Sequence, residues 1–386
     1  MRLIYMKKDI IIIGGGASSL FCALHLKDTN ICIIDPHPLG KKLLVTGNGK
    51  CNLTNTNCKT FISAYNIDIS KFLEVFDHND TIDTLHRLGL LVYEDDQGRI
   101  YPITNSAVSV QDTLVRAISN KVEYIRAKAT KVTPLSGGYR VHYDDTFVDA
   151  KYCIVACGGN AQIDLPNVDI QPFTRGLCGL TTTQNHGLNG VRVSPVKVTL
   201  TSKPYSEMGE VLFKEHGISG IVIMNMSNFI QDTASLELDL LPQYSQEYLL
   251  EHITSTIKNN ELLSSEILNG ILIKSLAANI LSKAKIDFNT SASTLNIEEI
   301  KKIVGFIKHY PIQVIGKESN NQIHLGGVPL KDLTSELEHK NNRNLYITGE
   351  YTQVKGQCGG YNLQWAFTSG TIVAKSINKR RENETN

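Results

Sequence analysis

The spacing of apolar residues predicts a strand, a helix and a second strand near the start of the chain. Ile10–Ile13 and Ile31–Ile34 are unbroken apolar runs, which are typical of strands that a parallel sheet buries on both faces. Glycines 14–16 separate the first run from a stretch with helical spacing. The pattern therefore predicts a βαβ unit and an α/β fold class with a doubly wound sheet.

Further along the chain the pattern changes. Residues 36–66 are polar and glycine-rich and are predicted to be loop, whereas the apolar spacing predicts helices over 68–90 and 109–119. Residues 121–160 indicate a β-meander that turns at Gly137-Gly138 and returns to a buried strand.

The second half of the chain first departs from this α/β pattern and then returns to it. Residues 170–240 alternate between apolar and polar positions, as strands do, and residues 243–309 are mostly helical. Residues 344–377 then predict a strand, a glycine-rich loop and a helix. We therefore expect one α/β domain that is built from both termini, with an insertion between them.

The turn after the first strand carries a dinucleotide-binding pattern. Gly14 permits a tight turn, Gly16 lets a pyrophosphate approach the backbone, and Ser19 is small enough for the helix to pack on the strand. The helix N-terminus offers free N–H groups to the phosphates. Asp35 ends the second strand, where a carboxylate can bond ribose hydroxyls. The pattern favours a dinucleotide, and the alternative is a tight turn with chance glycines.

Two later glycine sites distinguish between NAD and FAD. Gly158-Gly159 follows an apolar strand, and Gly349-Glu350 ends another strand and precedes a helix. In two-part flavoprotein folds, the strand before the first of these sites lies beside the adenine end of FAD. The strand before the second brings an acid to the ribityl chain. Backbone N–H groups of Gly356–Asn362 would stabilise the negative charge of a reduced flavin ring. Each site alone could be an ordinary turn, but all three in order favour FAD.

Composition and charge limit the classes of partner. At 386 residues the chain is long enough for two or three domains, and its 41% hydrophobic and 20% charged residues are ordinary for a globular protein. The net charge of +1 gives no electrostatic argument for nucleic acid or an anionic membrane as a partner. We therefore expect neither as a partner. A small-molecule substrate or electron donor is expected from the cofactor rather than from the charge, and the sequence does not indicate an oligomeric state.

The distribution of apolar residues and cysteines favours a cytoplasmic protein. No apolar run is long enough to span a bilayer, and Ile10–Ile13 is too short for a signal peptide. The eight cysteines include no CxxC pair, which disfavours both a disulfide framework and structural zinc. Because no histidines and acids have metal-binding spacing, no metal site is expected.

Several longer segments resemble a known family. GKKLLVTGNGKCNLTN, residues 40–55, is similar to the G-(R/K)-K-L-L-x-T-G-x-G-(R/K)-C-N-x-T-N block of the aminoacetone-oxidase-like, YhiN/BaiN-type FAD-dependent oxidoreductases. CGGYNLQWAFTSG, residues 358–370, resembles the C-terminal signature of that family. GRIYPITNSAVSV, GEVLFKEHGISG and HLGGV match further family segments, so the resemblance covers nearly the whole chain.

The resemblance implies a fold of three parts. These are a Rossmann-like FAD/NAD(P)-binding domain over 1–180 and 325–386, a β-barrel-like domain over 181–242 and 310–324, and a helical domain over 243–309. It also implies an FAD-dependent oxidoreductase that passes hydride between flavin N5 and NAD(P)H or a small organic substrate. The alternative is an FAD-holding binding or regulatory flavoprotein with little turnover. The neutral charge disfavours an RNA-modifying flavoprotein.

The chain departs from the family pattern in four segments, one of which, residues 160–195, matches the family poorly as a whole. Ala156–Gly159 has a cysteine where the family commonly has A-T-G-G, Lys214–His216 replaces a Thr-His pair, and His324-Leu325 stands where the family has threonine. These departures lie toward the flavin and the substrate, so they bear on turnover and substrate more than on FAD binding.

The positions expected to contact FAD come from these motifs. They are Gly14, Gly16, Ala17, Ser18, Ser19, Asp35, Lys42, Thr46, Gly47, Gly49, Cys51, Asn52, Cys157, Gly158, Gly159, Gly349, Glu350, Gly359, Gly360, Tyr361 and Asn362. We expect non-covalent FAD. Because residues 160–330 contain no second strand–GxGxxG–helix unit, a nicotinamide reductant would bind only transiently.

Three residues are candidates for a chemical role. Lys42 and Lys50 stand near Cys51 in the sequence and would favour a reactive thiolate, whereas the alternative is a small buried residue that packs the flavin loop. Cys358 could pair with Cys51, although no CxxC supports this. Tyr361 could donate a proton or stack on the flavin ring.

Overall fold

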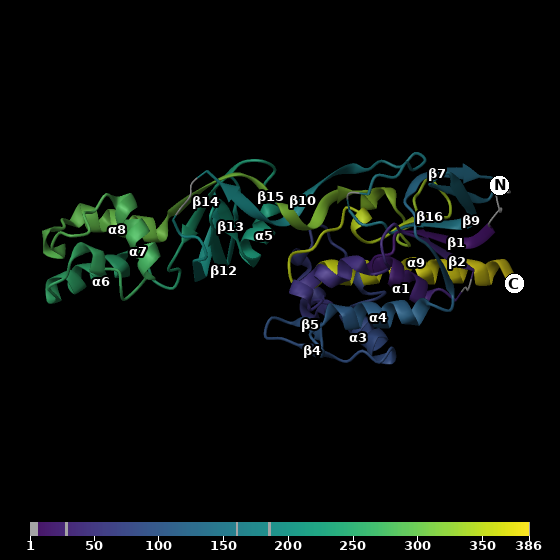
Figure 1. The fold of residues 1–386 in the computed structure, drawn as a ribbon, viewed down its shortest axis with the longest axis horizontal. Coiled ribbons are helices and arrows are strands. Elements are labelled where there is room, and N and C mark those ends of the chain that lie inside the picture. Colours follow the sequence, from purple (N-terminus) through teal and green to yellow (C-terminus); the bar gives the residue numbers. More distant parts are fainter. Residues whose placement is uncertain (1–6, 28–29, 160, 184–186, 386) are drawn as a thin grey trace. The chain divides into compact units, whose positions relative to one another are not determined.

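The computed structural model describes residues 7–27, 30–159, 161–183 and 187–385. The chain divides into two compact units, Met1–Thr174 with Ile323–Asn386 and Arg175–Gln322 (Figure 1). A domain built from both termini with an insertion is therefore confirmed. The further division of the insertion into a β domain and a helical domain stays a prediction.

The first unit is built on a seven-stranded sheet, with the strand order β6-β2-β1-β9-β8-β7 and with β16 paired to β9. The strands are β1 (Lys7–Ile13), β2 (Ile31–Ile34), β6 (Val122–Ile125), β7 (Ala129–Leu135), β8 (Gly138–Tyr143), β9 (Thr146–Val155) and β16 (Leu345–Ile347). β6, β2, β1, β9 and β16 run parallel, whereas β7 and β8 form an antiparallel hairpin beside β9. The predicted α/β fold is confirmed. The predicted meander holds for β7–β9, but β6 joins the parallel part of the sheet.

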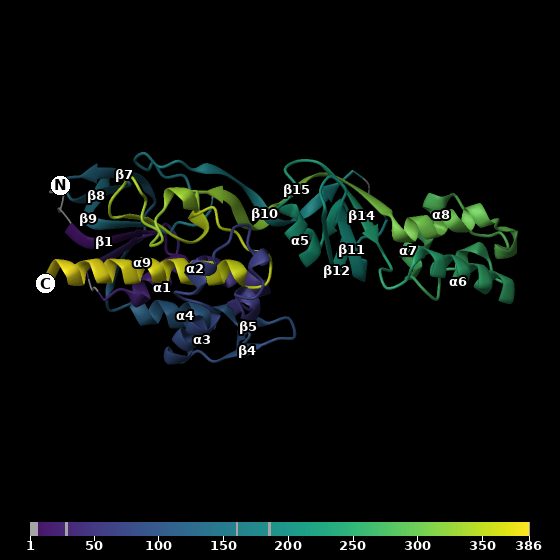
Figure 2. The same ribbon diagram turned by 180° about the vertical axis from the view of Figure 1, so that it is seen from behind.

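The first unit also contains helices. They are α1 (Ala17–His25), α2 (Ser70–Leu73), α3 (His78–Arg87), α4 (Ala107–Ile118) and α9 (Tyr361–Thr385). α9 runs beside α1 (Figure 2), and the two helices touch at Gly370, where any side chain would overlap the Ser18 carbonyl. The isoleucines of β1 and β2 are at most 3% exposed and form the centre of the core. The two ends of the chain therefore share one core.

Two local predictions need correction. The helix predicted over 68–90 is two helices, α2 and α3, because Asp77 begins a new one: its side chain accepts from the N–H groups of Asn79 and Asp80. The loop predicted over 36–66 contains 3-10 turns and a short strand. These are Lys41–Gly49, Thr56–Cys58, Ile62–Ala64 and β3 (Thr54–Asn55), which pairs with β5 (Arg99–Pro102) beside β4 (Val92–Glu94).

The second unit contains a closed six-stranded barrel and helices. The barrel order is β10 (Gln171–Thr182), β13 (Gly217–Ser219), β12 (Tyr205–Lys214), β11 (Arg192–Leu200), β14 (Ala234–Asp239) and β15 (Tyr310–Gly327). The helices are α5 (Ile221–Ser227), α6 (Gln246–Asn259), α7 (Lys274–Ala284) and α8 (Ile297–Lys308). One apolar core joins barrel residues such as Val198 to α8 residues such as Ile303. Nowhere in the described ranges is a helix both long and apolar enough to cross a membrane.

Candidate FAD-binding site

Four parallel strands bring the predicted glycine and acid positions to one edge of the sheet. Gly14 directly follows β1, Asp35 follows β2, Cys157 lies two residues beyond β9, and Gly349 lies two residues beyond β16. Carboxyl ends of parallel strands lie at the same edge of a sheet, where open α/β folds bind their ligands. Motifs from both ends of the sequence therefore meet at one place.

Gly14 holds the first loop against the turn after β9. Its φ of +102° belongs to the left-handed region, and a Cβ there would lie 2.5 Å from the Ala156 carbonyl oxygen and overlap Cys157. The Gly14 N–H donates to the Ile34 carbonyl at 2.8 Å. Only glycine fits this close approach, as the sequence pattern predicts.

Gly16 is different because it borders open space. A Cβ at Gly16 would meet no atom of the structure within 4 Å, and no side chain caps the N-terminus of α1 at this residue. The first N–H groups of a helix have no intrahelical acceptor and favour an anion. The Ser18 and Ser19 side chains of α1 are buried, so from these two residues only backbone N–H groups can face a ligand.

Asp35 organises the same loop. One carboxylate oxygen accepts from the Gly15 N–H at 2.7 Å, and the other accepts from the His37 N–H at 2.7 Å. These bonds tie the end of β2 to the glycine turn. Its predicted contact with ribose hydroxyls would use the remaining acceptor capacity of the carboxylate.

The turn after β9 forms a second glycine site. Gly158 has a φ of +72° and borders open space, whereas a Cβ at Gly159 would overlap the Glu350 carboxylate and lie 2.5 Å from His324 Cβ. Cys157 is half-buried, and burial raises the pKa of its thiol to about 12. The cysteine that replaces a threonine in this turn is therefore a neutral thiol.

Glu350 is half-buried and lies at the centre of a charge cluster. Oε2 accepts from Lys42 Nζ at 2.5 Å, and Oε1 accepts from the His324 N–H at 2.8 Å and lies 3.3 Å from His324 Nδ1. Burial by itself raises the pKa of Glu350, but Lys42, the His324 hydrogen bond and Lys355 outweigh it and lower the pKa to about 2. Glu350 is therefore ionised at every physiological pH.

The family-like block at 40–55 contacts the C-terminal signature directly. Asn55 Nδ2 donates to the Gly359 carbonyl at 3.0 Å, and Thr54 Oγ1 donates to Gln364 Oε1 at 2.5 Å. In the amide orientation that gives both its oxygen and its nitrogen a partner, the Asn52 side chain accepts from the Gly360 N–H at 3.2 Å and donates to the Thr54 carbonyl at 3.1 Å. The two most specific sequence motifs are therefore one structural unit.

Side chains also shape the glycine loop before α9. Gly359 and Gly360 have φ values of +124° and +99°. Asn362 Oδ1 accepts from the Gly356 N–H at 2.9 Å, and its Nδ2 donates to the Gly356 carbonyl at 2.8 Å. Tyr361 packs edge-on against Tyr65, with ring centroids 5.6 Å apart. The Asn362 side chain therefore fixes the shape of the loop by bonding both backbone groups of Gly356.

The three candidates for a chemical role have different surroundings. Cys51 is fully buried, and burial raises the pKa of its thiol to about 11, although Thr46 opposes this. Lys42, which was expected to lower the pKa of this thiol, forms an ion pair with Glu350. This environment favours the packing alternative over a reactive thiolate. Cys358 and Cys51 are not joined in a disulfide, and burial raises the pKa of Tyr361 to about 12, so its hydroxyl stays protonated.

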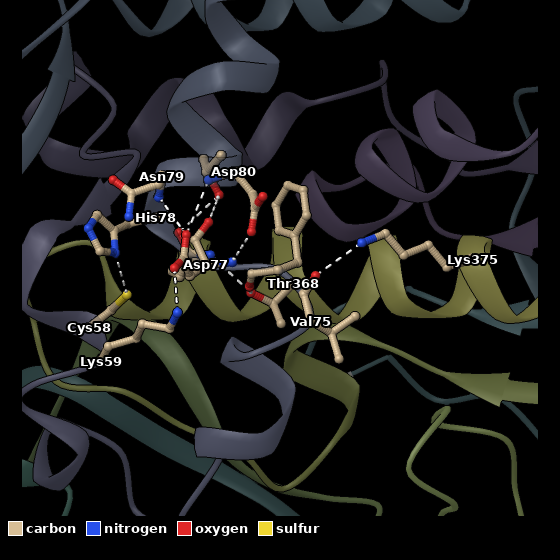
Figure 3. A network of polar contacts seen from close by, with 12 residues as sticks. Cys58, Lys59, Val75, Asp77, His78, Asn79, Asp80, Thr368 and Lys375 are labelled. Carbon is tan, nitrogen blue, oxygen red and sulfur yellow. Dashed lines mark hydrogen bonds and ion pairs between the residues drawn. The ribbon is translucent and has the colours of Figure 1, made fainter.

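A polar network behind the site joins residues 58–80 to α9. Asp77 accepts from the N–H groups that begin α3 and forms an ion pair with Lys59 at 2.7 Å (Figure 3). On α9, Thr368 Oγ1 donates to the Phe76 carbonyl and Lys375 Nζ donates to the Val75 carbonyl. This network anchors α9, whose N-terminus borders the glycine loop.

Sequence reasoning missed two of the residues that build the site. Lys355 is 3% exposed and bonds the Glu350 turn, yet no periodic pattern indicates a buried lysine. Gln364 lies within the quoted signature, but its bonds to Thr54 and Thr81 cross about three hundred residues, and no local signal reports them. Within the described residues, no cluster of three or more histidine, cysteine or acidic side chains could hold a metal ion.

The residues at this edge fit FAD. Open space at Gly16 and Gly158, beside an uncapped helix start, suits a pyrophosphate, and Asp35 and Glu350 are carboxylates that suit the hydroxyls of ribose and ribityl. The backbone of Gly359-Gly360 stays a predicted contact of the flavin ring. When bound, FAD supplies hydride transfer at its ring, while the protein supplies orientation and charge.

Comparison with protein families decides the assignment. The model of the HI0933-like protein Rossmann domain matches residues 8–376. The chain belongs to this HI0933-like family. The resemblance to YhiN/BaiN-type proteins is thereby confirmed, as is the predicted class of FAD-dependent oxidoreductase.

Full-length relatives of this HI0933-like protein carry two kinds of name. This chain is 28% identical to a 3-dehydro-bile acid delta(4,6)-reductase of Clostridium scindens, over 96% of this chain and 98% of the relative. It is 26% identical to ribosomal RNA dihydrouridine synthases of Haemophilus influenzae and Escherichia coli, again over 96% and 98%.

Solved structures show weaker likenesses. An E. coli quinol fumarate reductase gives a TM-score of 0.44 at 12% identity, with 99% of this chain and 72% of that chain covered. A thioredoxin reductase of T. acidophilum gives 0.35 at 10% identity, with 97% and 99% covered. Scores this low add no argument to the family assignment.

Proposed function

We propose that this protein is an FAD-dependent reductase of a carbon–carbon double bond conjugated with a carbonyl, with NAD(P)H as the electron donor. The observation that carries the proposal is the convergence of Gly14, Gly158 and Gly349 with Asp35 and Glu350 at one sheet edge. Family membership supplies the redox class.

The names of the relatives support this choice of bond. A delta(4,6)-reductase and a dihydrouridine synthase both add hydrogen across a carbon–carbon double bond, in a steroid enone or in a pyrimidine. The reaction adds a hydride to one carbon and a proton to the other, while NAD(P)H is oxidised to NAD(P)⁺. Both substrates are rings that carry a carbonyl.

The role of the chain's own residues follows from the site. We propose that the α1 N-terminus and the open faces of Gly16 and Gly158 hold the pyrophosphate without a covalent bond. Asp35 and Glu350 would bond the two sugar-like portions, since both are carboxylates at strand ends. The Gly359-Gly360 loop would border the ring and help to exclude water from it.

RNA is a second substrate class that the relatives favour. The net charge of +1 predicted no nucleic-acid partner, yet two full-length relatives are named as ribosomal RNA dihydrouridine synthases. Whole-chain charge therefore does not exclude RNA in this family. We keep a small-molecule enone and a uridine in RNA as two arms of one test.

Anaerobic reduction tests the proposal. Mixing purified protein with NADH or NADPH should bleach the flavin absorbance, and adding either a steroid enone or an unmodified ribosomal RNA fragment should restore it. The arm that restores the colour identifies the substrate class. No bleaching by either nicotinamide, and no recolouring of chemically reduced protein by either substrate, would favour the alternative of an FAD-holding protein without turnover.

A further inference from the structure

Lys355 is an almost fully buried lysine that stands between the two C-terminal motifs of the site. It is 3% exposed, and Nζ donates to the carbonyls of Glu350 and Thr352, each at 2.6 Å. Its backbone is fixed as well, because its N–H donates to Asn66 Oδ1 at 2.7 Å and its carbonyl accepts from the Asn66 N–H at 3.0 Å. Both ends of this residue are therefore held.

Lys355 lies in the chain between two elements with different predicted partners, and its side chain bonds the first of them. On one side is the turn that presents Glu350, and on the other is the loop that begins at Gly356. Trp365 completes the turn, because its Nε1 donates to the Gly349 carbonyl at 3.1 Å and to Thr352 Oγ1 at 2.9 Å. The Lys355 ammonium is the charged donor to the backbone carbonyls of this turn.

We propose that Lys355 is a positioning residue that fixes the Glu350 turn against the glycine loop, and that its charge makes FAD affinity depend on pH. The inference rests on the proposed FAD site and adds a residue to it. Its predicted partner is the ribityl side of the cofactor, through Glu350, rather than any direct contact of Lys355.

The surroundings of Lys355 set the direction of the pH effect. Burial lowers its pKa to about 8, with Lys42 acting in the same direction and Glu350 opposing both. The charged groups that face it are Glu350 and Lys42, while His324 and the neutral thiol of Cys157 face Glu350. Above about pH 8 the amine loses its charge and its carbonyl bonds lose their charge assistance. FAD affinity should therefore fall as pH rises through this value.

Lys121 offers a matched control. Its Nζ also donates to two backbone carbonyls, Leu24 at 2.8 Å and Leu26 at 3.0 Å, and burial lowers its pKa too. These carbonyls belong to the C-terminal end of α1, opposite the end that starts the site. K121M therefore removes the same kind of contact without touching the Glu350 turn.

The experiment measures the Kd of FAD for wild type, K355M and K121M from about pH 6.5 to about pH 9.5. For wild type, Kd should rise about fivefold across this range, since charge-assisted bonds are about twice as strong as neutral ones. For K355M, Kd should be about tenfold higher than wild type at neutral pH and should lose that slope. K121M should follow wild type in both respects. If K355M folds poorly, the wild-type slope alone decides.

A flat wild-type profile would overturn the inference, and so would a K355M profile that keeps the wild-type slope. Equal losses of affinity in K121M and K355M would also overturn it, because they would indicate general destabilisation. Wild-type protein that binds no FAD at any pH would overturn the proposed function and this inference together. Normal binding with a flat profile would overturn the inference alone.

Discussion

The two glycine-containing regions of the site are held in different ways. The N-terminal loop relies mainly on main-chain contacts, in which Gly14 bonds Ile34 and the Gly15 carbonyl accepts from Gly40, and the Asp35 side chain adds a bond to the Gly15 N–H. The C-terminal region relies on side chains from distant segments. These are Lys42, Asn55, His324, Lys355, Asn362 and Trp365.

The difference teaches what each region contributes. The N-terminal loop is a backbone device that any strand–turn–helix of this type can form, so it indicates a dinucleotide in general. The C-terminal region depends on charges and amides from distant segments that the tertiary fold brings together. Variants that separate backbone fit from side-chain support can therefore test the comparison.

The largest effect should come from Gly14→Ala. The added Cβ would overlap Cys157, and alanine would have to adopt a φ of +102°, so we expect a loss of about 4 kcal/mol in the free energy of unfolding. The measurement is denaturant unfolding. The control is Gly137→Ala, which has a φ of +94° but no atom within 4 Å of the Cβ, and which should cost only about 1–2 kcal/mol. Equal losses would refute the close approach.

Glu350→Gln tests the charge cluster of the C-terminal region. Removing the carboxylate charge leaves Lys42 without its ion-pair partner and Lys355 without a nearby negative charge, so we expect a loss of about 3 kcal/mol at neutral pH. The control is Glu298→Gln in the exposed ion pair with Lys301, which should change stability by no more than experimental error.

The stability difference between wild type and Glu350→Gln should decrease as pH falls. Because the pKa of Glu350 is lowered to about 2 in the folded protein, its contribution is fully present above the ordinary glutamate pKa of about 4.3. It should disappear as pH falls through about 2. Parallel unfolding curves of wild type and variant across this range would contradict the ionised cluster.

Asn55→Ala should have a smaller effect on the same region. Asn55 is 3% exposed, donates to the Gly359 carbonyl and accepts from the Asn57 N–H, so its removal should cost about 2 kcal/mol. Asn260→Ala is the control, since that amide also donates to a carbonyl, of Thr256, but is exposed. If the two thermal shifts are the same, Asn55 does not join the motifs.

Gly16→Ala should change ligand affinity more than stability. The Cβ would meet no atom within 4 Å, so unfolding should stay within about 0.5 kcal/mol of wild type. The methyl group would occupy the approach of the pyrophosphate, and the Kd of FAD should rise about tenfold or more. Unchanged FAD binding would remove the pyrophosphate from this face of α1.

The sequence pattern predicted most of the local structure correctly. The isoleucine runs gave the correct positions of β1 and β2, and the Gly14 spacing gave the correct turn. The break in the helix at Asp77 was missed although its signal, an acid three residues before Asp80, was present as a capping pattern. Local rules therefore account for the N-terminal half of the site.

The remaining features depend on distant contacts that a single sequence does not report. Lys42 stands near Cys51 in the chain, which suggested a thiolate, but the fold sends its ammonium to Glu350 and buries the thiol. In the same way, nothing near Lys355 in the sequence indicates that its charge is buried. These side chains obtain their roles from the tertiary structure.

Titration of flavin-free protein with FAD, FMN and NAD⁺ tests the central claim most directly. The claim is that Gly14–Asp35 and Gly349–Asn362 together hold both halves of one cofactor. It predicts one equivalent of FAD per chain, bound more tightly than either FMN or NAD⁺, because each of those compounds matches only part of the site. Failure to bind FAD, or binding of NAD⁺ as tightly as FAD, would contradict it.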